Sequence, residues 1–389
     1  MSDENRLRTI LAAPNIDGTD VGEGFVAFKW AEALSELVDL TVLSFERPGR
    51  AALAGQLPDA KVVAWPEPAW ARKHERFNAM AKPAYPVFAR YVRRYMAESL
   101  GAGQRIDLAH LIMPQAARYP VPFRHFPVPY IVGPLGGGLD TPPGFASEMS
   151  HAPVYTRLRN LDSFRFRYDP ALRASYTGAE IVLGVAPYMA RVLSDIGLKR
   201  FEPVLELGID ALAPDVLRQP KPDCLRLLHV GRGVRTKGLR DVVRALARLK
   251  DRPGITLTSA GGGKEIELCK AEAEALGVAE RVSFLGLIQR EEVEDLYRSH
   301  DVFTFPSFRE PAGGVLYEAM RWGLPIITVA RGGPDWIIDD QSGVRLPIST
   351  PQVLAADLAE VIADLADNPS KRLALGQGAR DKVAREGLW

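Results

Sequence analysis

The sequence predicts an α/β protein of two domains, each built on a parallel sheet that helices cover. Short apolar runs that suit strands alternate with stretches whose apolar residues recur at helical spacing, and this alternation is typical of parallel sheets. The length of 389 residues is long for one hydrophobic core and suits two domains. Residues 206–223 contain three prolines and are the predicted linker.

The individual strands and helices follow from this alternation. Residues 8–14 form a predicted strand, a glycine-containing loop follows, and apolar spacing predicts a helix at about 25–37 and a strand at 40–45. Later strands of this half are predicted at residues 61–64, 108–112, 130–132 and 181–185, before a helix at 187–196. The predicted strands of the second half are residues 225–230, 255–260, 282–285, 302–305 and 325–329. We therefore expect two Rossmann-like domains facing a cleft, residues 1–205 and residues 224–389.

The composition argues against several classes of protein. An apolar content of 47% and a charged content of 25% are globular values. A net charge of +1 without a nucleic-acid motif argues against nucleic acid as a partner. Cys224 and Cys269 form no CxxC pair or Cys/His cluster, which argues against a disulfide scaffold and a structural zinc site. The first residues lack a signal-peptide core, and Pro and Gly interrupt the longest apolar runs, so we expect a cytoplasmic protein.

The most informative segment is residues 306–333, in which Glu310 and Glu318 flank a Gly313-Gly314 pair. Apolar residues three and four positions apart predict a helix that begins near Gly313. The unpaired amides and the dipole at such a helix start favour an anion. Glu318 has two acceptor oxygens that suit a pair of ribose hydroxyls, and Glu310 precedes the helix, where a sugar hydroxyl could lie. The alternative is that both are ordinary solvated glutamates.

A second motif occupies residues 225–238, LRLLHVGRGVRTKG, where an apolar strand runs into a glycine-containing turn and then a helix. Arg232 and Lys237 fall on the turn at the carboxyl end of the strand, where ligands bind in open parallel sheets. A guanidinium and an ammonium complement a diphosphate and could stabilise the charge that grows on it as a leaving group. The alternative is two surface cations beside a turn.

Together the two motifs resemble glycosyltransferase family 4, a family of retaining GT-B transferases that use nucleotide sugars. The glycine-rich run at residues 132–145 resembles a loop of its bacterial exopolysaccharide-type members. The family pattern of a strand, Gly-Arg-x4-Lys-Gly and a later Glu-x7-Glu pair is matched between residues 230 and 333. The resemblance implies that Arg232 and Lys237 grip the donor diphosphate. It also implies that Glu310 contacts the transferred sugar and that Glu318 holds the ribose.

The resemblance implies further donor contacts from glycines and backbone groups. The residues concerned are Gly22, Gly24, Leu287, Ile288, Gly313, Gly314 and Val315. The last three would present amides to the phosphates, and the FLGLI run would hold the nucleobase through its backbone. The first glycine-rich loop would lie near the donor phosphate or the acceptor.

Glycine clusters after strands could also indicate a dinucleotide site. Gly22-x-Gly24 and the run at residues 261–263 lack the Gly-x-Gly-x-x-Gly spacing, and no acidic residue ends the following strand, so an NAD site is a poor match. The run at 261–263 could simply permit a tight turn. The run at 136–138 could either approach a sugar or phosphate or form such a turn.

Two histidines lie in or at the end of predicted strands. Family members often carry histidines where His110 lies, close to the transferred sugar, so the resemblance adds His110 to the catalytic candidates Glu310, Arg232 and Lys237. The alternative for His110 is a structural histidine with satisfied hydrogen bonds. His229 lies inside an apolar strand and is a predicted core residue.

Residues 61–130 carry eleven Lys and Arg against four Asp and Glu. Interleaved with them are Trp65, Trp70, Phe77, Tyr85, Phe88, Tyr91 and Tyr95. Such a mixture suits anionic lipid headgroups, as in family members that act on lipid-linked acceptors. A partly buried helix with a solvated basic face explains the same residues, and Pro83 and Pro86 favour this alternative because they interrupt any long amphipathic helix. A second basic cluster could bind acidic sugar, pyrophosphate or membrane; it comprises Arg157, Arg159, Arg165, Arg167 and Arg173.

The resemblance implies a retaining glycosyltransferase that moves a sugar from a nucleotide diphosphate sugar to a hydroxyl acceptor, which is a growing glycan or a lipid-linked oligosaccharide. A UDP-sugar is the favoured donor and a GDP-sugar the alternative. No metal and no other cofactor is expected, because cations would replace the metal and no Asp-x-Asp cluster stands out.

Other functions on the same fold remain open. They are a noncatalytic nucleotide-sugar-binding subunit, a sugar-nucleotide epimerase, and a phosphorylase, for which no pyridoxal phosphate lysine is identifiable. Family members commonly continue past the position of Trp389 with a helix that crosses back onto the N-terminal domain. Either this protein is shortened or that helix is absent, and if it is absent, domain closure is expected to have less support. The expected location is the cytoplasm, with peripheral contact at the inner face of the cell membrane as the further alternative.

Overall fold

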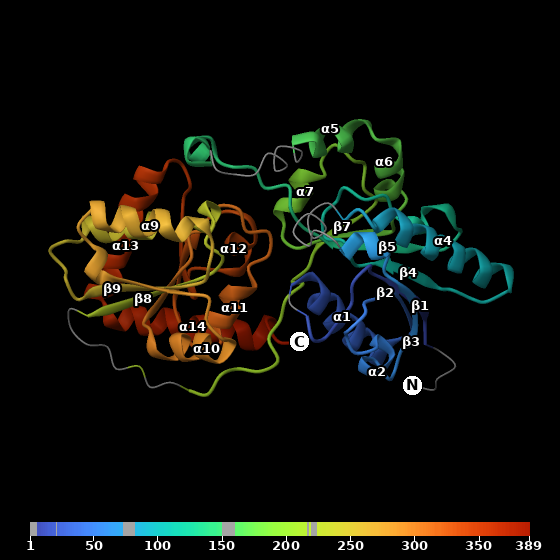
Figure 1. The fold of residues 1–389 in the computed structure, drawn as a ribbon, viewed down its shortest axis with the longest axis horizontal. Coiled ribbons are helices and arrows are strands. Elements are labelled where there is room, and N and C mark those ends of the chain that lie inside the picture. The colour runs from blue at the N-terminus through green and yellow to red at the C-terminus, as the bar shows by residue number, and fades with distance from the viewer. Residues whose placement is uncertain (1–5, 21, 73–81, 150–159, 216–217, 219–223) are drawn as a thin grey trace. The chain divides into compact units, whose positions relative to one another are not determined.

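The computed structural model describes residues 6–20, 22–72, 82–149, 160–215, 218 and 224–389. The chain divides into two compact units, one formed by Met1–Gly138 with Val154–Glu206 and the other by Leu139–Pro153 with Leu207–Trp389. Each unit is built on one parallel sheet covered by helices (Figure 1). The predicted α/β class, with two Rossmann-like units, is confirmed.

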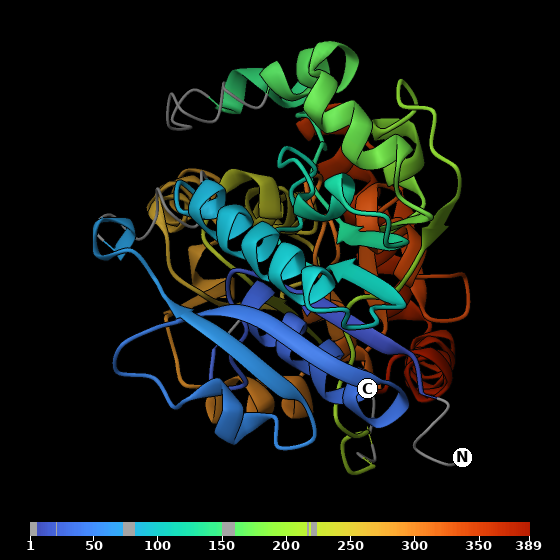
Figure 2. The same ribbon diagram turned by 90° about the vertical axis from the view of Figure 1, so that its right-hand side faces the viewer.

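The first unit has the strand order β3-β2-β1-β4-β5-β6-β7. The strands are β1 (Arg8–Ala12), β2 (Asp39–Glu46), β3 (Lys61–Pro66), β4 (Leu108–Leu111), β5 (Tyr130–Leu135), β6 (Ile181–Gly184) and β7 (Phe201–Pro203). The helices are α1 (Glu23–Leu37), α2 (Leu53–Gln56), η2 (Ala69–Arg72), α4 (Tyr85–Gly101), η3 (Pro122–His125), α5 (Asn160–Tyr168), α6 (Pro170–Thr177) and α7 (Tyr188–Val192). Figure 2 shows α4, in cyan, lying along the strands of this sheet.

The second unit has the strand order β10-β9-β8-β11-β12-β13. The strands are β8 (Leu225–Val230), β9 (Ile255–Ala260), β10 (Val282–Gly286), β11 (Val302–Thr304), β12 (Ile326–Val329) and β13 (Gly343–Leu346). The helices are η4 (Pro143–Met149), η6 (Arg235–Lys237), α8 (Leu239–Arg248), α9 (Lys264–Ala275), η7 (Ala279–Arg281), α10 (Arg290–Ser299), α11 (Gly314–Met320), α12 (Gly332–Ile337), α13 (Pro351–Asp367) and α14 (Pro369–Glu386). Figure 1 shows α9 and α13 on one side of this sheet and α10 and α14 on the other.

The strand order explains where a ligand would bind in each unit. In the second unit the chain proceeds outward from β8 to β10, then returns to the other side of β8 with β11. The carboxyl ends of β8 and β11 therefore mark the switch point of the sheet. The corresponding switch point of the first unit lies between β1 and β4.

The predicted strands agree with the structure to within one or two residues at most ends, because each is a short apolar run. Two strands were not predicted. β7 has three half-buried residues, and β13 begins at a glycine and includes an arginine. The predicted helix at 187–196 is shorter in the structure, where α7 spans Tyr188–Val192.

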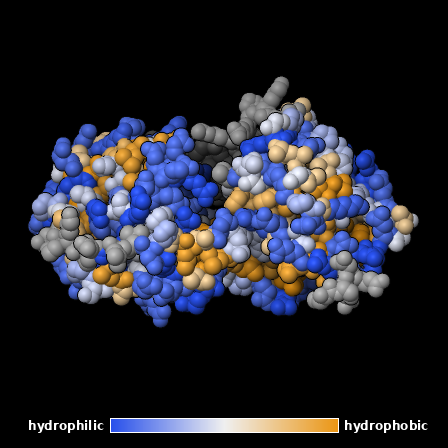
Figure 3. All heavy atoms as spheres, turned by 90° about the horizontal axis from the view of Figure 1, so that it is seen from below, coloured by the Kyte–Doolittle hydropathy of each residue, from blue (hydrophilic) through white to orange (hydrophobic). Residues whose placement is uncertain are grey.

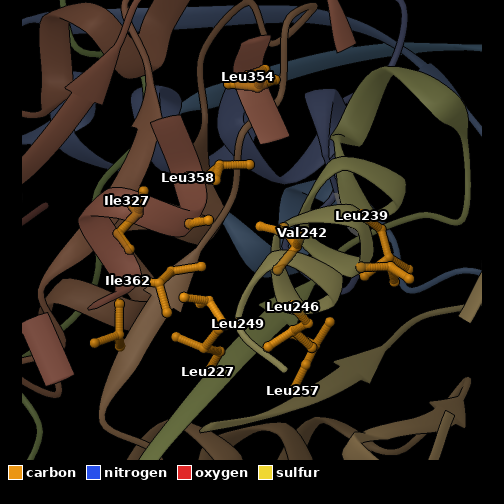
Figure 4. Packing of buried hydrophobic residues seen from close by; sticks show 14 of the residues in the cluster. Leu227, Leu239, Val242, Leu246, Leu249, Leu257, Ile327, Leu354, Leu358 and Ile362 are labelled. Atoms are coloured by element: carbon orange, nitrogen blue, oxygen red, sulfur yellow. The ribbon is translucent and has the colours of Figure 1, made fainter. Parts of the chain in front are cut away.

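The core of the second unit lies between the sheet and the helices α8 and α13 (Figure 4). α8 contributes Leu239, Val242 and Leu246, and Leu249 directly follows the helix. They meet Leu354, Leu358 and Ile362 of α13 above the strand residues Leu227, Leu257 and Ile327. Since α8 directly follows the turn that carries Lys237, this packing fixes the end of that turn.

The units differ from the predicted domains in one place. Residues 139–153 belong to the second unit, although the sequence predicted them within an N-terminal domain of residues 1–205. The first unit ends at Glu206, where the linker of residues 206–223 was predicted to begin. Ile209 pairs with Leu388 of the second unit, so the start of this segment is already attached there. Residues 216–217 and 219–223 lie outside the described part of the chain.

Hydrophilic residues dominate the face shown in Figure 3, with apolar residues in scattered patches. In the basic segment of residues 61–130, the Trp65 and Tyr91 rings stack at 5.3 Å, and Phe88 of α4 is fully buried. These contacts favour the partly buried helix over a lipid-facing one, while Phe77 lies outside the described residues. Within the described ranges, no helix has the length and apolar character that crossing a membrane requires.

The second basic cluster is partly occupied by protein groups. Arg165 forms an ion pair with Asp169 at 2.9 Å. Arg173 donates to the carbonyls of Phe166 and Asp195 at 3.2 and 2.7 Å. The other members Arg157 and Arg159 lie outside the described residues.

We predict that Leu246→Ala destabilises the second unit by about 2–5 kcal/mol, because it removes a fully buried side chain and leaves a cavity between α8 and the sheet. The matched control is Leu268→Ala on α9, which is 40% exposed and should cost about 1 kcal/mol. Urea unfolding of the full chain measures both. Equal costs would mean that α8 does not anchor this core.

Candidate functional site

The predicted site residues of the second unit lie on loops at the carboxyl edge of its sheet. Arg232 and Lys237 follow β8, while Glu310, Gly313 and Gly314 follow β11. These are the two strands at the switch point of the sheet.

Lys237 and Glu310 meet directly at this point. The Lys237 ammonium donates a hydrogen bond to the Glu310 carboxylate, and the two side chains are only 12% and 14% exposed. The ammonium also lies 5.2 Å from the centre of the Phe305 ring, a distance at which a cation is attracted to an aromatic face. Because an ammonium has three N–H groups, Lys237 retains donors for a ligand.

The two loops are joined by backbone contacts. The carbonyl of Thr236 accepts a hydrogen bond of 3.1 Å from the Phe308 amide and one of 3.0 Å from Ser307 Oγ. Gly238 has φ 79°, and a side chain there would place its Cβ 2.3 Å from the Pro306 carbonyl oxygen. The sequence therefore needs glycine at 238 because two backbone segments touch there.

His229 supports the same loop from below. As predicted, it is a core residue, 1% exposed, and its Nε2 lies 3.1 Å from the carbonyl of Lys237. Burial lowers the pKa of His229 to about 4, so its ring is neutral at neutral pH. The hydrogen bond therefore runs from Nε2 to the carbonyl.

Glu310 is fixed from the opposite side by the loop after β12. Its carbonyl accepts a hydrogen bond of 2.9 Å from the Gly333 amide. A Cβ at Gly332 would lie 2.4 Å from the same carbonyl oxygen, and one at Gly333 would lie 1.9 Å from that of Ala312. Both glycines thus let the two loops approach closely, and the Glu310 side chain leaves a backbone held on both sides.

The Gly313-Gly314 pair begins α11, which has seven residues. Gly313 has a left-handed backbone with φ 106°, a conformation in which glycine avoids strain. The amides of Gly313, Gly314 and Val315 donate to no group in the described part of the chain. They are the amides that the sequence predicted for phosphate, although a helix this short adds little dipole.

Glu318 lies on α11 and is held by a side chain that the sequence did not single out. The hydroxyl of the buried Tyr297 on α10 donates to Glu318 Oε2 at 3.0 Å. Burial raises the pKa of Glu318. The hydrogen bond fixes one carboxylate oxygen and leaves the other for a ligand.

Arg232, which was predicted to bind the diphosphate together with Lys237, differs from Lys237 in its contacts. Its side chain is exposed and, within the described ranges, has no hydrogen bond or ion pair. The structure thus brings Lys237 and Glu310 into contact and leaves the Arg232 guanidinium without a protein partner on the same loop. An unpaired guanidinium keeps all of its N–H donors for an anion.

Leu287 and Ile288 follow β10 at the same edge of the sheet. Leu287 is 86% exposed, and its side chain lies over Gly262, whose Cβ would be 2.9 Å from Leu287 Cγ. A Cβ at Gly261 would lie 1.9 Å from the Gly231 carbonyl oxygen. The glycines at 261–263 are therefore explained by backbone packing, as the tight-turn alternative proposed.

In the first unit, His110 is the third of the four residues of β4, one of the two strands at the switch point. It is 4% exposed, its Nε2 lies 2.6 Å from the Gly133 carbonyl, and its ring packs edge-on against Trp30. Burial lowers the pKa of His110 to about 4. A neutral ring whose Nε2 donates to a backbone carbonyl fits the structural alternative better than a proton-transfer role at neutral pH.

Gly22 and Gly24 lie at the start of α1, after β1. Gly22 has φ 69°, and a Cβ at Gly24 would lie 2.3 Å from Asn15 Nδ2. The same loop carries Asp17, which hydrogen bonds from Thr19 and the nearby charge of Arg50 keep at a lowered pKa although burial by itself would raise it. Negative charge on this loop suits sugar hydroxyls better than phosphate.

The glycines at 136–138 form a turn within the first unit. The Tyr188 hydroxyl lies 3.2 Å from the amide and 3.0 Å from the carbonyl of Gly137. Gly138 has φ 70°, and a Cβ there would lie 2.6 Å from Val192 Cγ1. These contacts are those of the tight-turn alternative.

Comparison with known proteins agrees with the motifs. Residues 218–382 match the sequence model of the glycosyl transferases group 1. Glycogen synthase of Mycobacterium tuberculosis is 32% identical over 189 residues, covering 48% of this chain and 45% of that protein. The lipopolysaccharide core biosynthesis glycosyltransferase LpsE of Rhizobium meliloti is 28% identical over 225 residues, covering 55% and 64%. The chain thus spans less than two thirds of the length of either relative.

The fold matches solved structures over nearly the whole chain. Anabaena HepE, crystallised in complex with UDP, superposes with a TM-score of 0.66 and 15% identity, covering 98% of this chain and 96% of that chain. At this identity the likeness establishes the fold alone. The protein therefore has the GT-B fold of two Rossmann-like units, and its second unit carries the region that is similar to the glycosyl transferases of group 1.

Two contributors to the site carried no signal in the sequence. Tyr297 precedes Glu318 by 21 positions and meets it only because α10 and α11 pack together. Arg235 forms a buried double hydrogen bond with Asp241, at 2.7 and 2.8 Å. The RTKG sequence shows the arginine, but no local pattern reveals its partner.

We predict that neutral His110 adds stability that is lost in acid. The pKa of His110 is 6.5 in the unfolded chain and about 4 in the folded chain. Its contribution to the free energy of unfolding is therefore complete above pH 6.5 and falls by about 3 kcal/mol as the pH approaches 4. His110→Gln keeps an N–H donor but does not titrate, so its stability should depend less on pH over this range.

The control is His125→Gln. His125 is exposed, and although burial also lowers its pKa, this variant should change the pH dependence less than His110→Gln does. Urea unfolding at pH 7 and pH 4.5 compares the three proteins. An unchanged pH dependence in His110→Gln would show that His110 is not buried in its neutral form.

Proposed function

We propose that the chain is a retaining glycosyltransferase that moves a sugar from a nucleotide diphosphate sugar to a hydroxyl acceptor, a growing glycan or a lipid-linked oligosaccharide. The contact between Lys237 and Glu310 at the switch point carries this proposal. It lies within residues 218–382, the region similar to the glycosyl transferases of group 1. The same arrangement places a cation for phosphate beside a carboxylate for sugar hydroxyls.

The reaction requires that negative charge on the departing diphosphate be stabilised. When the bond between the sugar C1 and the diphosphate oxygen breaks, the electron pair stays on that oxygen. The Lys237 ammonium, the Arg232 guanidinium and the amides of Gly313 and Gly314 would carry this charge, since all lie on the loops after β8 and β11. In a partly buried site such fixed donors act more strongly than in water.

Retention of configuration would follow from attack on the face that the diphosphate leaves. The acceptor oxygen forms the new bond to C1, and its proton passes to the departing diphosphate. Glu310 would position the transferred sugar through its carboxylate, which its contact with Lys237 orients. No residue of the chain is assigned as a covalent nucleophile.

The nucleotide would be held by the rest of the same edge. Glu318, oriented by Tyr297, would accept from the ribose hydroxyls. Backbone groups at Leu287 and Ile288 would face the base. We favour UDP as the donor nucleotide, because Anabaena HepE, which has the same fold, was crystallised in complex with UDP, and GDP is the alternative.

The first unit would then bind the acceptor. The Asp17 carboxylate on its first glycine loop is suited to hydroxyl groups, and the loop lies at the switch point of that sheet. We propose that the protein acts in the cytoplasm, where nucleotide sugars are available. Contact with the membrane surface would then occur through a lipid-linked acceptor.

The first test is nucleotide binding. We predict that one diphosphate nucleotide among UDP, GDP, ADP and dTDP raises the thermal stability of the chain, by about 2.7 kcal/mol at a concentration 100 times its Kd. Arg232→Ala/Lys237→Ala should abolish this effect. The control Arg248→Ala/Lys250→Ala makes the same charge change at the other end of α8 and should retain it. Stabilisation that survives in Arg232→Ala/Lys237→Ala would move the diphosphate site elsewhere.

The second test is transfer. We predict that Lys237→Ala and Glu310→Gln each lower kcat by about 10²–10³-fold with the fold intact, because each removes a group that acts on the reacting centre. The controls are Lys371→Ala on α14 and Glu360→Gln on α13, which make the same substitutions at exposed positions. Turnover of a sugar nucleotide is followed by product analysis. Nucleotide binding without transfer in the wild type would favour the noncatalytic subunit.

A further inference from the structure

Residues 139–149, which we call the inserted segment, come from the first half of the chain but pack on the second unit. The segment includes η4 (Pro143–Met149). The motifs of the proposed donor site do not include any of its residues, and it lies outside the region similar to group 1 transferases, which begins at residue 218.

Phe145 inserts into the core of the second unit. It is fully buried, and its ring centre lies 4.5 Å from that of Phe308. The guanidinium of Arg235 lies over both rings, at 5.1 and 5.4 Å. Phe308 lies in the loop that carries Glu310, and its amide donates to the Thr236 carbonyl. Phe145 therefore supports the loop after β11 from beneath.

Glu148 reaches the loop after β8. Its Oε2 accepts from Arg235 Nε at 2.6 Å, and its Oε1 lies 2.9 Å from Arg244 Nη1. The Arg235 side chain is 4% exposed, and its Nη1 and Nη2 each donate one hydrogen bond to Asp241. Burial by itself would raise the pKa of Glu148, but the charge of Arg235 lowers it. The carboxylate is thus ionised and bonded to a buried cation.

Arg235 links these contacts to the proposed site. It is the first residue of η6, and Lys237 is the last. Its guanidinium is held by Glu148 and Asp241 and packs on Phe145 and Phe308, and two residues later the Lys237 ammonium donates to Glu310. The inserted segment thus touches both loops that supply this pair.

The first part of the segment contacts the next loops along the same edge. The carbonyl of Asp140 accepts from Arg331 at 3.0 Å, and Thr141 Oγ1 lies 3.4 Å from Arg309 Nη1. Gly144 lies so close to residue 349 that a Cβ would be 2.2 Å from the Ser349 carbonyl oxygen. The segment is held by backbone as well as by side chains.

We propose that Glu148 and Phe145 are positioning residues of the donor site, and that through Arg235 and Phe308 they hold the Lys237–Glu310 pair in the arrangement that receives a diphosphate. This inference rests on the proposed function for its ligand but not for its geometry. Neither residue touches the donor. Both act through the loops after β8 and β11, whose side chains would contact the donor.

The variant that separates positioning from general stability is Glu148→Gln, with Glu272→Gln as its matched control. Glu272 on α9 also binds Arg244 and is similarly buried, at 24% exposure against 17% for Glu148, but it has no ion pair with Arg235. Both variants take a carboxylate from Arg244. Only Glu148→Gln takes a carboxylate from the arginine that begins η6.

Hydrogen–deuterium exchange of the full chain without nucleotide is the first readout. The amides of Lys237, Gly238 and Phe308 donate within the two loops at 3.0, 3.2 and 3.1 Å and report on them. In Glu148→Gln, peptides covering residues 235–238 and 307–310 should exchange about tenfold faster, whereas in Glu272→Gln they should match the wild type. Equal exchange in all three proteins would overturn the proposal.

The second readout is affinity for UDP and for UMP, measured by calorimetry. Glu148→Gln should weaken UDP about tenfold and leave UMP within about twofold, because only UDP has the terminal phosphate that Lys237 would bind. Equal weakening of both nucleotides would indicate a general structural role and would overturn the proposal. If the wild type binds no UDP, the proposed donor fails, and the exchange experiment still decides the role of Glu148.

Phe145→Leu provides a second variant that keeps an apolar side chain in the core. It should speed exchange in residues 307–310 more than in residues 235–238, because Phe308 is its aromatic partner. A melting temperature close to that of the wild type with this pattern of exchange supports positioning. Faster exchange spread evenly over the second unit would mean that Phe145 acts only on global stability, and would overturn its part of the proposal.

Discussion

The candidate site depends on one backbone carbonyl, that of Thr236, which accepts from the Phe308 amide and from Ser307 Oγ. These two hydrogen bonds join the loop after β8 to the loop after β11. Lys237 directly follows the carbonyl, and Glu310 lies two residues after Phe308, so joining the loops brings the two side chains together. The ion pair is thus a consequence of backbone geometry. A cation held on a fixed loop in this way is a preorganised donor for negative charge.

The same dependence on backbone explains why the glycines of this chain are hard to interpret. Gly238, Gly261 and Gly333 each lie where a Cβ would be 2.3 Å or less from a carbonyl oxygen of a neighbouring loop. Gly313 is required for its left-handed conformation, and the amide that it exposes is a separate property. A glycine at the carboxyl edge of a parallel sheet therefore has a packing reason first. Only the free amides after β11 add a reason that involves a ligand.

The fold could be predicted from the sequence, because it depends on local patterns, whereas the contact between Lys237 and Glu310 was not among the predictions. Apolar runs gave the positions of most strands, and strands at a switch point direct their following loops to a common edge, which brings Lys237 and Glu310 together. Side chains that meet through tertiary packing could not be predicted: Tyr297 reaches Glu318 across two helices, and β13 and β7 are too short or too polar to register as apolar runs. For His110, a resemblance suggested catalysis, and only its burial and its contact with Gly133 favour a structural role.

The boundary between the units also depends on tertiary packing that the sequence does not show. A linker rich in proline predicted one crossing of the chain between the units, yet residues 139–153 also belong to the second unit. No periodicity could reveal this, because Phe145 reads as an ordinary apolar residue in a loop and Glu148 as an ordinary surface acid. Their partners Phe308 and Arg235 would otherwise present an uncovered aromatic ring and a buried cation with one carboxylate fewer. The core of the second unit is therefore completed by a part of the chain that its own motifs do not contain.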